Sequence, residues 1–127
     1  MQIVNAVEFL HADAEIAHMD LKLENILLAE NFNIKICDFG FCQSSLTRNF
    51  KSMGTEGYKA PEIYKLLSRY DNNKDILKVG YSGVSADLFA LGVTLFIMHF
   101  GIPPFTRAEG QFDRYYKIIS HFSKSVD

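Results

Sequence analysis

The sequence predicts a mainly α-helical fold of the α+β class that contains one short β-hairpin. Apolar residues recur at helical spacing from Gln2 to about Ala12, which is typical of an amphipathic helix. Residues 87–98 are apolar nearly all round, which predicts a helix buried on every side. Two short apolar runs, 26–28 and 34–37, flank a polar stretch that favours a turn, so they predict the hairpin.

The predicted hairpin places two polar residues at one edge. Asn25 precedes its first strand, and Asp38 follows its second strand. Because the strands of a hairpin are antiparallel, the start of the first lies beside the end of the second. We therefore expect Asn25 and Asp38 to lie at the same edge of the hairpin.

Loop and helix signals fill the rest of the chain. Residues 41–59 have no sustained period, which predicts a long loop, and long loops in compact domains tend to be functional. The polar stretch 68–75 predicts a surface insertion. Gly101 and the prolines after it end the helix over 87–98, and apolar residues between 112 and 119 predict one more amphipathic helix.

Length and charge limit the classes of partner. The 127 residues, of which 48% are hydrophobic, suffice for one globular unit with a single core. A formal net charge of −2 without a basic cluster argues against nucleic acid and anionic lipid as partners. The longest apolar run, 88–100, is interrupted by polar residues and is too short to span a bilayer, so we expect no membrane partner.

The cysteines and the first residues indicate a compartment. Only Cys37 and Cys42 occur, which favours a reducing environment over a disulfide scaffold or a zinc site. The first residues lack the basic and apolar regions of a secretory signal. We therefore expect a cytoplasmic, intracellular protein.

Three short motifs follow one another between residues 18 and 62. They are His18 to Asn25, then Asp38-Phe39-Gly40, then Ala60-Pro61-Glu62. Each tripeptide alone recurs by chance, so a single match means little. In the first motif, however, Asn25 stands five positions after Asp20, and the order of all three matches the protein kinase signature. The chain therefore resembles the catalytic half of a eukaryotic protein kinase.

The resemblance implies a reaction and a role for each residue. Phosphoryl transfer needs a group that accepts the substrate hydroxyl proton, ligands for Mg²⁺, and a cation near the transferred phosphate. By resemblance, Asp20 is the catalytic base, and Lys22 is the cation and marks the serine/threonine branch. The other implied roles are Mg²⁺ binding by Asn25 and Asp38, substrate binding by Glu24 and Thr55, and nucleotide binding by Leu27 and Cys37. The implied cofactors are ATP and Mg²⁺, and the implied partner is a protein substrate.

Several of these residues also have a plainer interpretation. An isolated Asp is usually a solvated loop residue, and only spacing argues otherwise for Asp20 and Asp38. His18 is expected to pack against Phe39 and support its loop. Asp87 either ties down the backbone of the loop at 18–25, as the resemblance implies, or is a helix-terminal Asp favoured by the helix dipole.

The resemblance covers a partial kinase domain. A complete kinase has a further lobe with a Gly-rich loop and a strand Lys, so we expect residues 1–127 to be a truncated C-lobe without the N-lobe. The alternatives are a non-catalytic interaction module and an incomplete gene product.

One substitution bears on regulation. Met19 stands where many kinases have an Arg that binds a phosphate on loop 41–59, which by resemblance is the activation segment. Lys51 stands where many carry the phosphorylated Thr, with Ser52 beside it. We therefore expect an activity that does not depend on phosphorylation of this loop.

Overall fold

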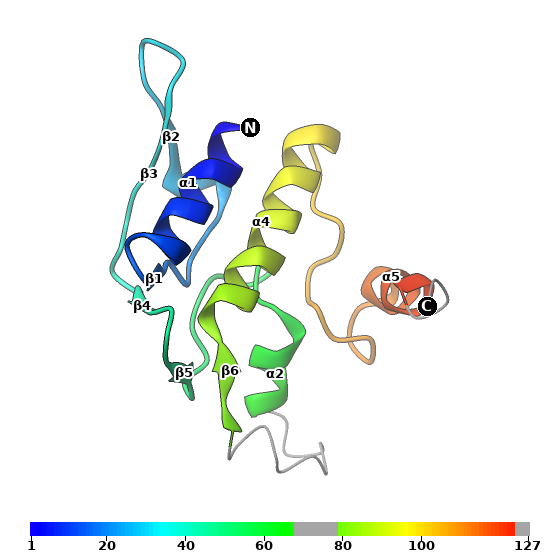
Figure 1. The fold of residues 1–127 in the computed structure, drawn as a ribbon. Helices are drawn as coiled ribbons and strands as arrows, with labels where there is room; N and C mark the ends of the chain where they lie inside the picture. Colours follow the sequence, from blue (N-terminus) through cyan, green and yellow to red (C-terminus); the bar gives the residue numbers. More distant parts are fainter. Residues whose placement is uncertain (68–78, 124–127) are drawn as a thin grey trace.

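The computed structural model describes residues 1–67 and 79–123, which form helices and short antiparallel strands (Figure 1). The predicted insertion at 68–75 lies outside the described residues. In chain order the elements are α1 (Gln2–Ala12), β1 (Ile16–Ala17), the 3-10 helix η1 (Leu23–Asn25), β2 (Ile26–Leu28), β3 (Ile34–Ile36), β4 (Gln43–Ser44), β5 (Arg48–Asn49), α2 (Pro61–Leu67), β6 (Tyr81–Ser82), α4 (Gly83–Phe100) and α5 (Arg114–Ser123).

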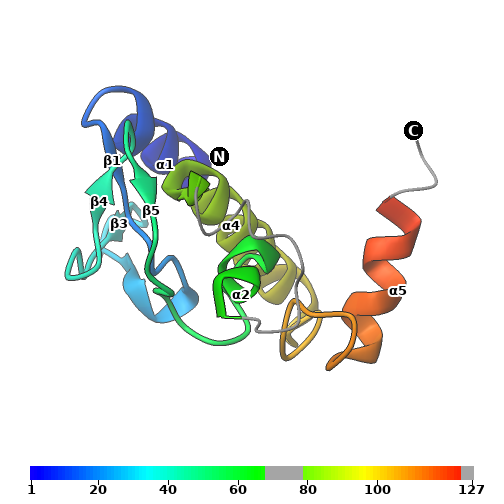
Figure 2. The same cartoon turned by 90° about the horizontal axis from the view of Figure 1, so that it is seen from below.

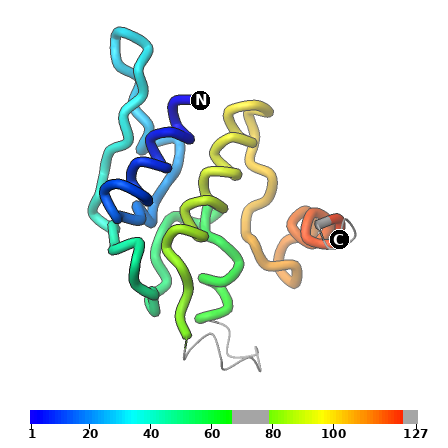
Figure 3. Tube along the Cα trace, viewed as in Figure 1, coloured from blue at the N-terminus to red at the C-terminus, as the bar shows by residue number. Residues whose placement is uncertain are grey.

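Helix α1 has the bounds that its apolar spacing predicts. Its buried face includes Ile3 and Val7, one turn apart. These two side chains pack with Leu21 and Leu91, so α1 lies beside the middle of α4 (Figure 3). The contact brings the start of the chain onto a helix that follows some eighty residues later.

Strands β2 and β3 form the predicted hairpin, with Ile26 opposite Ile36 and Leu28 opposite Ile34. Two further antiparallel pairs in the described ranges, β1 with β4 and β5 with β6, were not predicted. Each of their strands has two residues, which is too short for an alternating pattern to be recognised. Loop 41–59 therefore contains two short strands, of which β4 pairs with β1 and β5 pairs with β6.

Helix α4 begins earlier than predicted. Its first residue is Gly83 rather than Asp87, because Ser82 acts as the N-cap and its side chain accepts a hydrogen bond from the Ser85 amide at 3.3 Å. The helix ends where predicted, at Gly101, whose φ of 74° is in the left-handed region that glycine favours. Asp87 therefore lies in the second turn of α4 and does not open it.

The prediction that this helix is buried on every side is wrong. Leu88 is 55% exposed and Met98 is 58% exposed, so α4 has an open face. The earlier start gives α4 18 residues, which by length and composition is enough to cross a membrane, contrary to our prediction for the shorter run. A helix in the core of a globular protein passes the same test, and the buried residues of α4 are Gly83, Ala86, Asp87, Ala90, Leu91, Val93 and Thr94.

Helix α5 was predicted from the apolar residues near 112–119 and begins at Arg114. It lies at the edge of the molecule, beyond α4 (Figure 2). Tyr116 packs its ring edge-on against Phe105, with the ring centroids 5.2 Å apart. Tyr115, Ile118 and Ile119 of the same helix are exposed.

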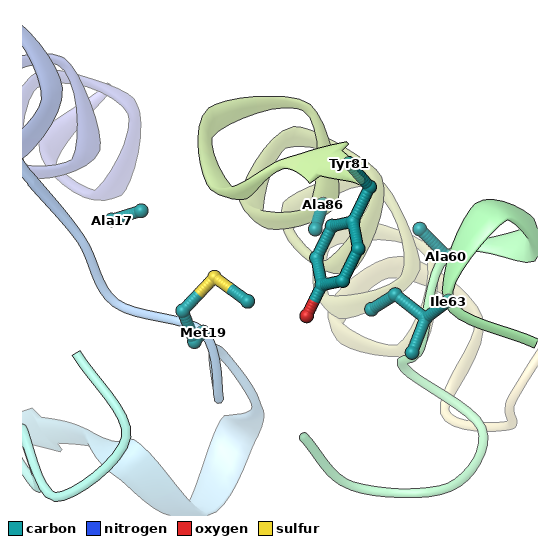
Figure 4. Close-up of a cluster of buried hydrophobic side chains, with 6 residues drawn as sticks. All are labelled: Ala17, Met19, Ala60, Ile63, Tyr81 and Ala86. Carbon is teal, nitrogen blue, oxygen red and sulfur yellow. The ribbon is translucent and has the colours of Figure 1, made fainter. Parts of the chain in front are cut away.

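One apolar cluster joins β1, loop 18–25, α2, β6 and α4 (Figure 4). Gly83 allows this close packing, because a Cβ there would lie 2.7 Å from the Ala17 Cβ and 3.0 Å from the Met19 sulfur. Figure 4 shows the Met19 side chain between Ala17 on one side and Tyr81 on the other. The buried members are Ala17, Met19, Ala60, Ile63, Tyr81 and Ala86.

Candidate active site

Three polar side chains meet where loop 18–25 faces loop 41–59. Asp20 Oδ1 accepts a hydrogen bond from Thr55 Oγ1 at 2.6 Å, and Asp20 Oδ2 lies 2.9 Å from Lys22 Nζ. Lys22 Nζ also donates to Thr55 Oγ1 at 2.8 Å, which closes a triangle of three contacts. Asp20 is only 4% exposed, so these bonds satisfy a carboxylate that is largely withdrawn from water.

The triangle keeps Asp20 ionised. Burial by itself raises the pKa of Asp20, but the hydrogen bonds from Thr55 and Lys22 outweigh it and leave the pKa below the usual value. The bond to Asp20 raises the pKa of Lys22 against a smaller opposing effect of burial. The Asp20–Lys22 pair therefore carries opposite charges at neutral pH.

Asn25 is held directly against Asp20. Its Nδ2 donates to the Asp20 carbonyl at 2.9 Å and lies 3.4 Å from Asp20 Oδ2. The Asn25 carbonyl accepts from the Cys37 amide at 2.9 Å, so the hairpin continues up to this residue. With its amide nitrogen engaged, Asn25 has its side-chain oxygen available as a ligand.

Asp38 follows β3 and is exposed. Its φ of 63° is in the left-handed region, which Asp tolerates better than most residues, and its Oδ1 accepts from the Gly40 amide at 3.3 Å. Asp38 is close enough to Lys22 for its charge to help raise the pKa of Lys22. The structure thus brings Asp20, Lys22, Asn25 and Asp38 to one edge of the hairpin.

The protein groups at this edge are too few to bind a metal ion by themselves, so a bound phosphate and water would have to supply further ligands. In residues 1–67 and 79–123, no group of three or more His, Cys, Asp or Glu side chains could hold a metal ion. Mg²⁺ commonly binds to one or two protein carboxylates and takes its other oxygens from substrate phosphates and water. One carboxylate from Asp38 and one amide oxygen from Asn25 fit that mode of binding.

The other predicted site residues are less close to the triangle. Glu24 is exposed in η1, and its negative charge contributes to the raised pKa of Lys22. Leu27 lies in β2 opposite Lys35 and is 51% exposed. Cys37 is half-buried beyond β3, and its thiol lies 3.5 Å from the Asn25 carbonyl oxygen. Leu27 and Cys37 therefore occupy the hairpin, whereas the triangle lies in the loops.

Asp87 supports the loop that carries Asp20. Its Oδ2 accepts from the His18 amide at 2.7 Å, and its Oδ1 accepts from the Met19 amide at 2.8 Å. Of the two interpretations that the sequence left open, this geometry matches the one that ties down the loop backbone. His11 was missed by the sequence analysis, and its Nε2 shares a 2.8 Å hydrogen bond with Asp87 Oδ2. Its position in the last turn of a predicted helix was the only signal.

His18 is fully buried in the structural position expected for it. Its Nε2 shares a hydrogen bond with the Cys37 carbonyl at 3.0 Å, and its ring lies 4.9 Å from that of Phe39. It therefore joins loop 18–25 to the segment after β3.

A model of the protein kinase domain matches residues 1–126. The chain belongs to the protein kinase family. It is 45% identical over 105 residues to the phosphorylase b kinase gamma catalytic chain, liver/testis isoform, of Mus musculus, an alignment that covers 81% of this chain and 24% of the relative. It is 41% identical over 112 residues to the serine/threonine-protein kinase SRK2A of Arabidopsis thaliana, covering 85% of this chain and 27% of the relative.

A third relative is similar in extent. The CBL-interacting serine/threonine-protein kinase 10 of Arabidopsis thaliana is 37% identical over 109 residues, which is 82% of this chain and 20% of the relative. The chain thus spans between 20% and 27% of the length of these relatives.

In this kinase-family chain, the Met19 side chain is part of the apolar core. Met19 is 4% exposed, and its φ of 70° is in the left-handed region. Its carbonyl lies so close to Gly54 that a Cβ there would be 2.9 Å from the oxygen, and Gly54 itself has a φ of 95°. A glycine is therefore needed where loop 41–59 approaches loop 18–25.

Loop 41–59 also contacts the residues that lead into α4. Tyr81 donates its hydroxyl to the Lys51 carbonyl at 2.8 Å, and burial raises the pKa of Tyr81 to about 12. Arg48 donates to the carbonyls of Val79 and Gly80, both at 3.1 Å. The sequence analysis missed these contacts, because they join segments about thirty residues apart with no pattern that links them.

Proposed function

We propose that this chain is the catalytic-loop portion, in the C-lobe, of a serine/threonine protein kinase that transfers the γ-phosphate of ATP to a protein hydroxyl. The observation that carries the proposal is the triangle of Asp20, Lys22 and Thr55, in which a buried carboxylate is oriented by two donors. The names of the relatives, which include serine/threonine kinases, support the substrate class.

In this proposal Asp20 receives the substrate hydroxyl. Its lowered pKa keeps the carboxylate ionised, so it can accept the hydrogen bond of the hydroxyl and then its proton. Thr55 and Lys22 fix the orientation of the carboxylate before the substrate arrives, which removes reorganisation from the reaction. The ammonium group of Lys22 also balances the negative charge of the transferred phosphoryl group.

Asn25 and Asp38 would bind Mg²⁺, which when bound neutralises charge on the phosphates of ATP. Their place beside Asp20 and Lys22 supports this assignment. Leu27 and Cys37, on the hairpin that ends at these ligands, would contact the nucleotide. Glu24 and Thr55 would contact the protein substrate.

Asp20→Asn tests the reaction. We expect phosphate transfer to a mixed pool of serine and threonine peptides to fall by about a hundredfold or more, because the proton acceptor is lost. The assay uses the longest translated protein that carries this segment, with radiolabelled ATP. Asp13→Asn, an exposed carboxylate after α1, is the matched control and should leave transfer unchanged. Equal activity of wild type and Asp20→Asn would contradict the role of Asp20.

Asp38→Asn tests the metal site. The loss of one carboxylate should weaken ATP binding in the presence of Mg²⁺ and change it little in EDTA. Calorimetric titration with ATP in both buffers separates the two effects. Equal ATP affinities for wild type and Asp38→Asn in Mg²⁺ would rule out the assignment.

A further inference from the structure

Helix α5 (Arg114–Ser123) carries an apolar face at the edge of the molecule. Tyr115, Ile118 and Ile119 lie three and four positions apart, so they share one face of the helix. Phe122 extends that face by one turn. Each of these four residues is between 44% and 70% exposed. Figures 1 and 2 both show α5 standing apart from the other helices, so the apolar face belongs to a projecting part of the surface.

A different side of α5 holds the helix to the rest of the protein. Tyr116 packs its ring against that of Phe105, which is buried. Asp113 accepts a hydrogen bond from the Tyr116 amide at 2.9 Å and so fixes the first turn. Lys117 lies against Gly110, where an added Cβ would be 3.5 Å from the Lys117 Cβ. The apolar face is therefore presented by a helix that is anchored through other side chains.

Positive charge accompanies the apolar face along the helix. Arg114 and Lys117 are three positions apart and are both exposed. Neither has an ion-pair partner within 4.0 Å in the part of the chain that the structure describes. No Asp or Glu occurs in residues 114–123. Of the acidic residues just before the helix, Asp113 is buried in hydrogen bonds and Glu109 has an ion-pair partner of its own, so α5 is locally basic.

We propose that α5 binds to the surface of an anionic lipid bilayer. A helix with an aromatic and aliphatic face beside Lys and Arg lies in the plane of such a surface, with its apolar face in the acyl boundary and its cations among the headgroups. The net charge of −2 disfavours lipid binding for the chain as a whole, but the charge of α5 itself is complementary to anionic lipid. The proposal is independent of the proposed function, because none of the residues assigned to phosphate transfer lies in α5.

The chemistry of the apolar face favours lipid over a protein partner. The face has one hydroxyl, that of Tyr115, and no amide or charged group. It therefore offers few hydrogen bonds by which a specific protein surface could be recognised, whereas the acyl boundary of a bilayer requires none. An acidic protein groove is the other class of partner that suits a basic amphipathic helix, and it predicts no binding to lipid vesicles.

Co-sedimentation of the full chain with vesicles tests the proposal. Vesicles of phosphatidylcholine with about one third phosphatidylserine should bind the chain about tenfold more tightly than phosphatidylcholine alone. Ile118→Glu places a carboxylate in the apolar face and should weaken binding by about tenfold or more. Leu28→Glu makes the same change of charge at an exposed position of β2, is the matched control, and should bind like the wild type.

The basic residues have a separate test on the same vesicles. Lys117→Gln should weaken binding to the anionic vesicles about fivefold and leave binding to phosphatidylcholine unchanged. A wild-type chain that stays in solution with both types of vesicle would overturn the proposal. Equal binding by the Ile118→Glu and Leu28→Glu proteins, both folded by circular dichroism, would also overturn it.

A fluorescence test avoids introducing a charge into the helix. The chain contains no tryptophan, so Tyr115→Trp places a single fluorophore on the apolar face, and Leu28→Trp places one on the hairpin. The emission of the Tyr115→Trp protein should shift to shorter wavelength when anionic vesicles are added, because the indole enters the acyl boundary. The emission of the Leu28→Trp protein should not shift. The absence of a shift in the Tyr115→Trp protein, or the same shift in both proteins, would contradict lipid binding through α5.

Discussion

Thr55 joins loop 41–59 to loop 18–25 through side-chain hydrogen bonds. Its hydroxyl donates to Asp20 and at the same time accepts from Lys22, so it acts as donor and acceptor at once. An apolar side chain of the same shape would leave Asp20 with one donor fewer and Lys22 with one acceptor fewer. The orientation and the pKa of Asp20 therefore both depend on this one hydroxyl.

Thr55→Val tests that dependence. The pKa of Asp20 should rise, because a hydrogen bond to its ionised form is lost, so the acidic limb of the activity profile should move to higher pH. Activity at pH 7 should fall by about tenfold to a hundredfold. Thr55→Ser keeps the hydroxyl and is the control, and profiles of kcat/KM against pH measure the effect. An acidic limb that is the same in Val and Ser variants would contradict the argument.

The sequence predicted the site residues that lie within one motif, but it did not predict the contacts from residues that are distant in the chain. The resemblance of one motif to the kinase signature brought Asp20, Lys22 and Asn25 into one prediction, and the structure places them together. His11 and Tyr81 were missed. A lone His in a helix and a lone Tyr before one have no sequence pattern, and only the fold brings them to Asp87 and Lys51.

Asp113 shows how a single carboxylate holds an element in place. It immediately precedes α5, and its Oδ1 accepts from the Tyr116 amide at 2.9 Å. Its Oδ2 accepts from the amide and the hydroxyl of Thr106, at 2.8 and 2.7 Å. The Tyr116 amide foremost, against the opposing effect of burial and with further help from Thr106 and Arg107, lowers the pKa of Asp113 to about 2.

This pKa gives the stability of the chain a defined pH dependence. Because the folded-state pKa is lowered from 3.8 to about 2, Asp113 stabilises the fold fully above about pH 4. That contribution is lost as pH falls toward 2. Asp113→Asn replaces one acceptor oxygen by a donor, so it should cost about 1 kcal/mol or more of unfolding free energy at pH 7 and show a smaller further loss between pH 4 and pH 2.

Urea unfolding at a series of pH values measures both effects. Asp13→Asn provides a matched control, since Asp13 is exposed beside the end of α1. Parallel stability curves for wild type and Asp113→Asn below pH 4 would contradict the assignment.

Elements were predicted well where a repeating pattern had room to develop. The bounds of α1 were predicted correctly, and the hairpin of β2 and β3 was too. The start of α4 was missed because Gly83 to Ala86 contains no apolar period, and its cap depends on Ser82. Its open face was missed because an apolar sequence does not say how many neighbours a helix has.

At the scale of the whole molecule, loop 41–59 is held by packing and hydrogen bonds, including the bond from Tyr81 to the Lys51 carbonyl. Met19 lies in the apolar cluster of Figure 4, and β5 pairs with β6. Ser52, beside Lys51, has a buried hydroxyl without a hydrogen-bond partner in the residues that the structure describes. The Ser52 hydroxyl would have to become exposed before it could be phosphorylated. Met19 has an uncharged thioether and offers no cation to pair with the phosphate.

We therefore expect the activity to be insensitive to phosphorylation of this segment. Phosphatase treatment of the full-length protein should change its activity by less than tenfold, about 1.4 kcal/mol. Tyr81→Phe, which removes the bond to the Lys51 carbonyl, should lower activity without altering this insensitivity. A tenfold or larger loss that rephosphorylation of Ser52 restores would show that Met19 does not have the effect argued here.

The bonds from Asp87 to the catalytic loop have a consequence for biosynthesis. His18 and Met19 are separated from Asp87 by 69 and 68 positions in the chain. At typical rates of translation, a ribosome needs about 3 to 14 seconds to add that many residues. During this interval the two amides have no carboxylate to bind, and the loop that carries Asp20 stays unformed. Loop 18–25 is thus made well before the helix that fixes it, and it can become ordered only after that helix has been synthesised.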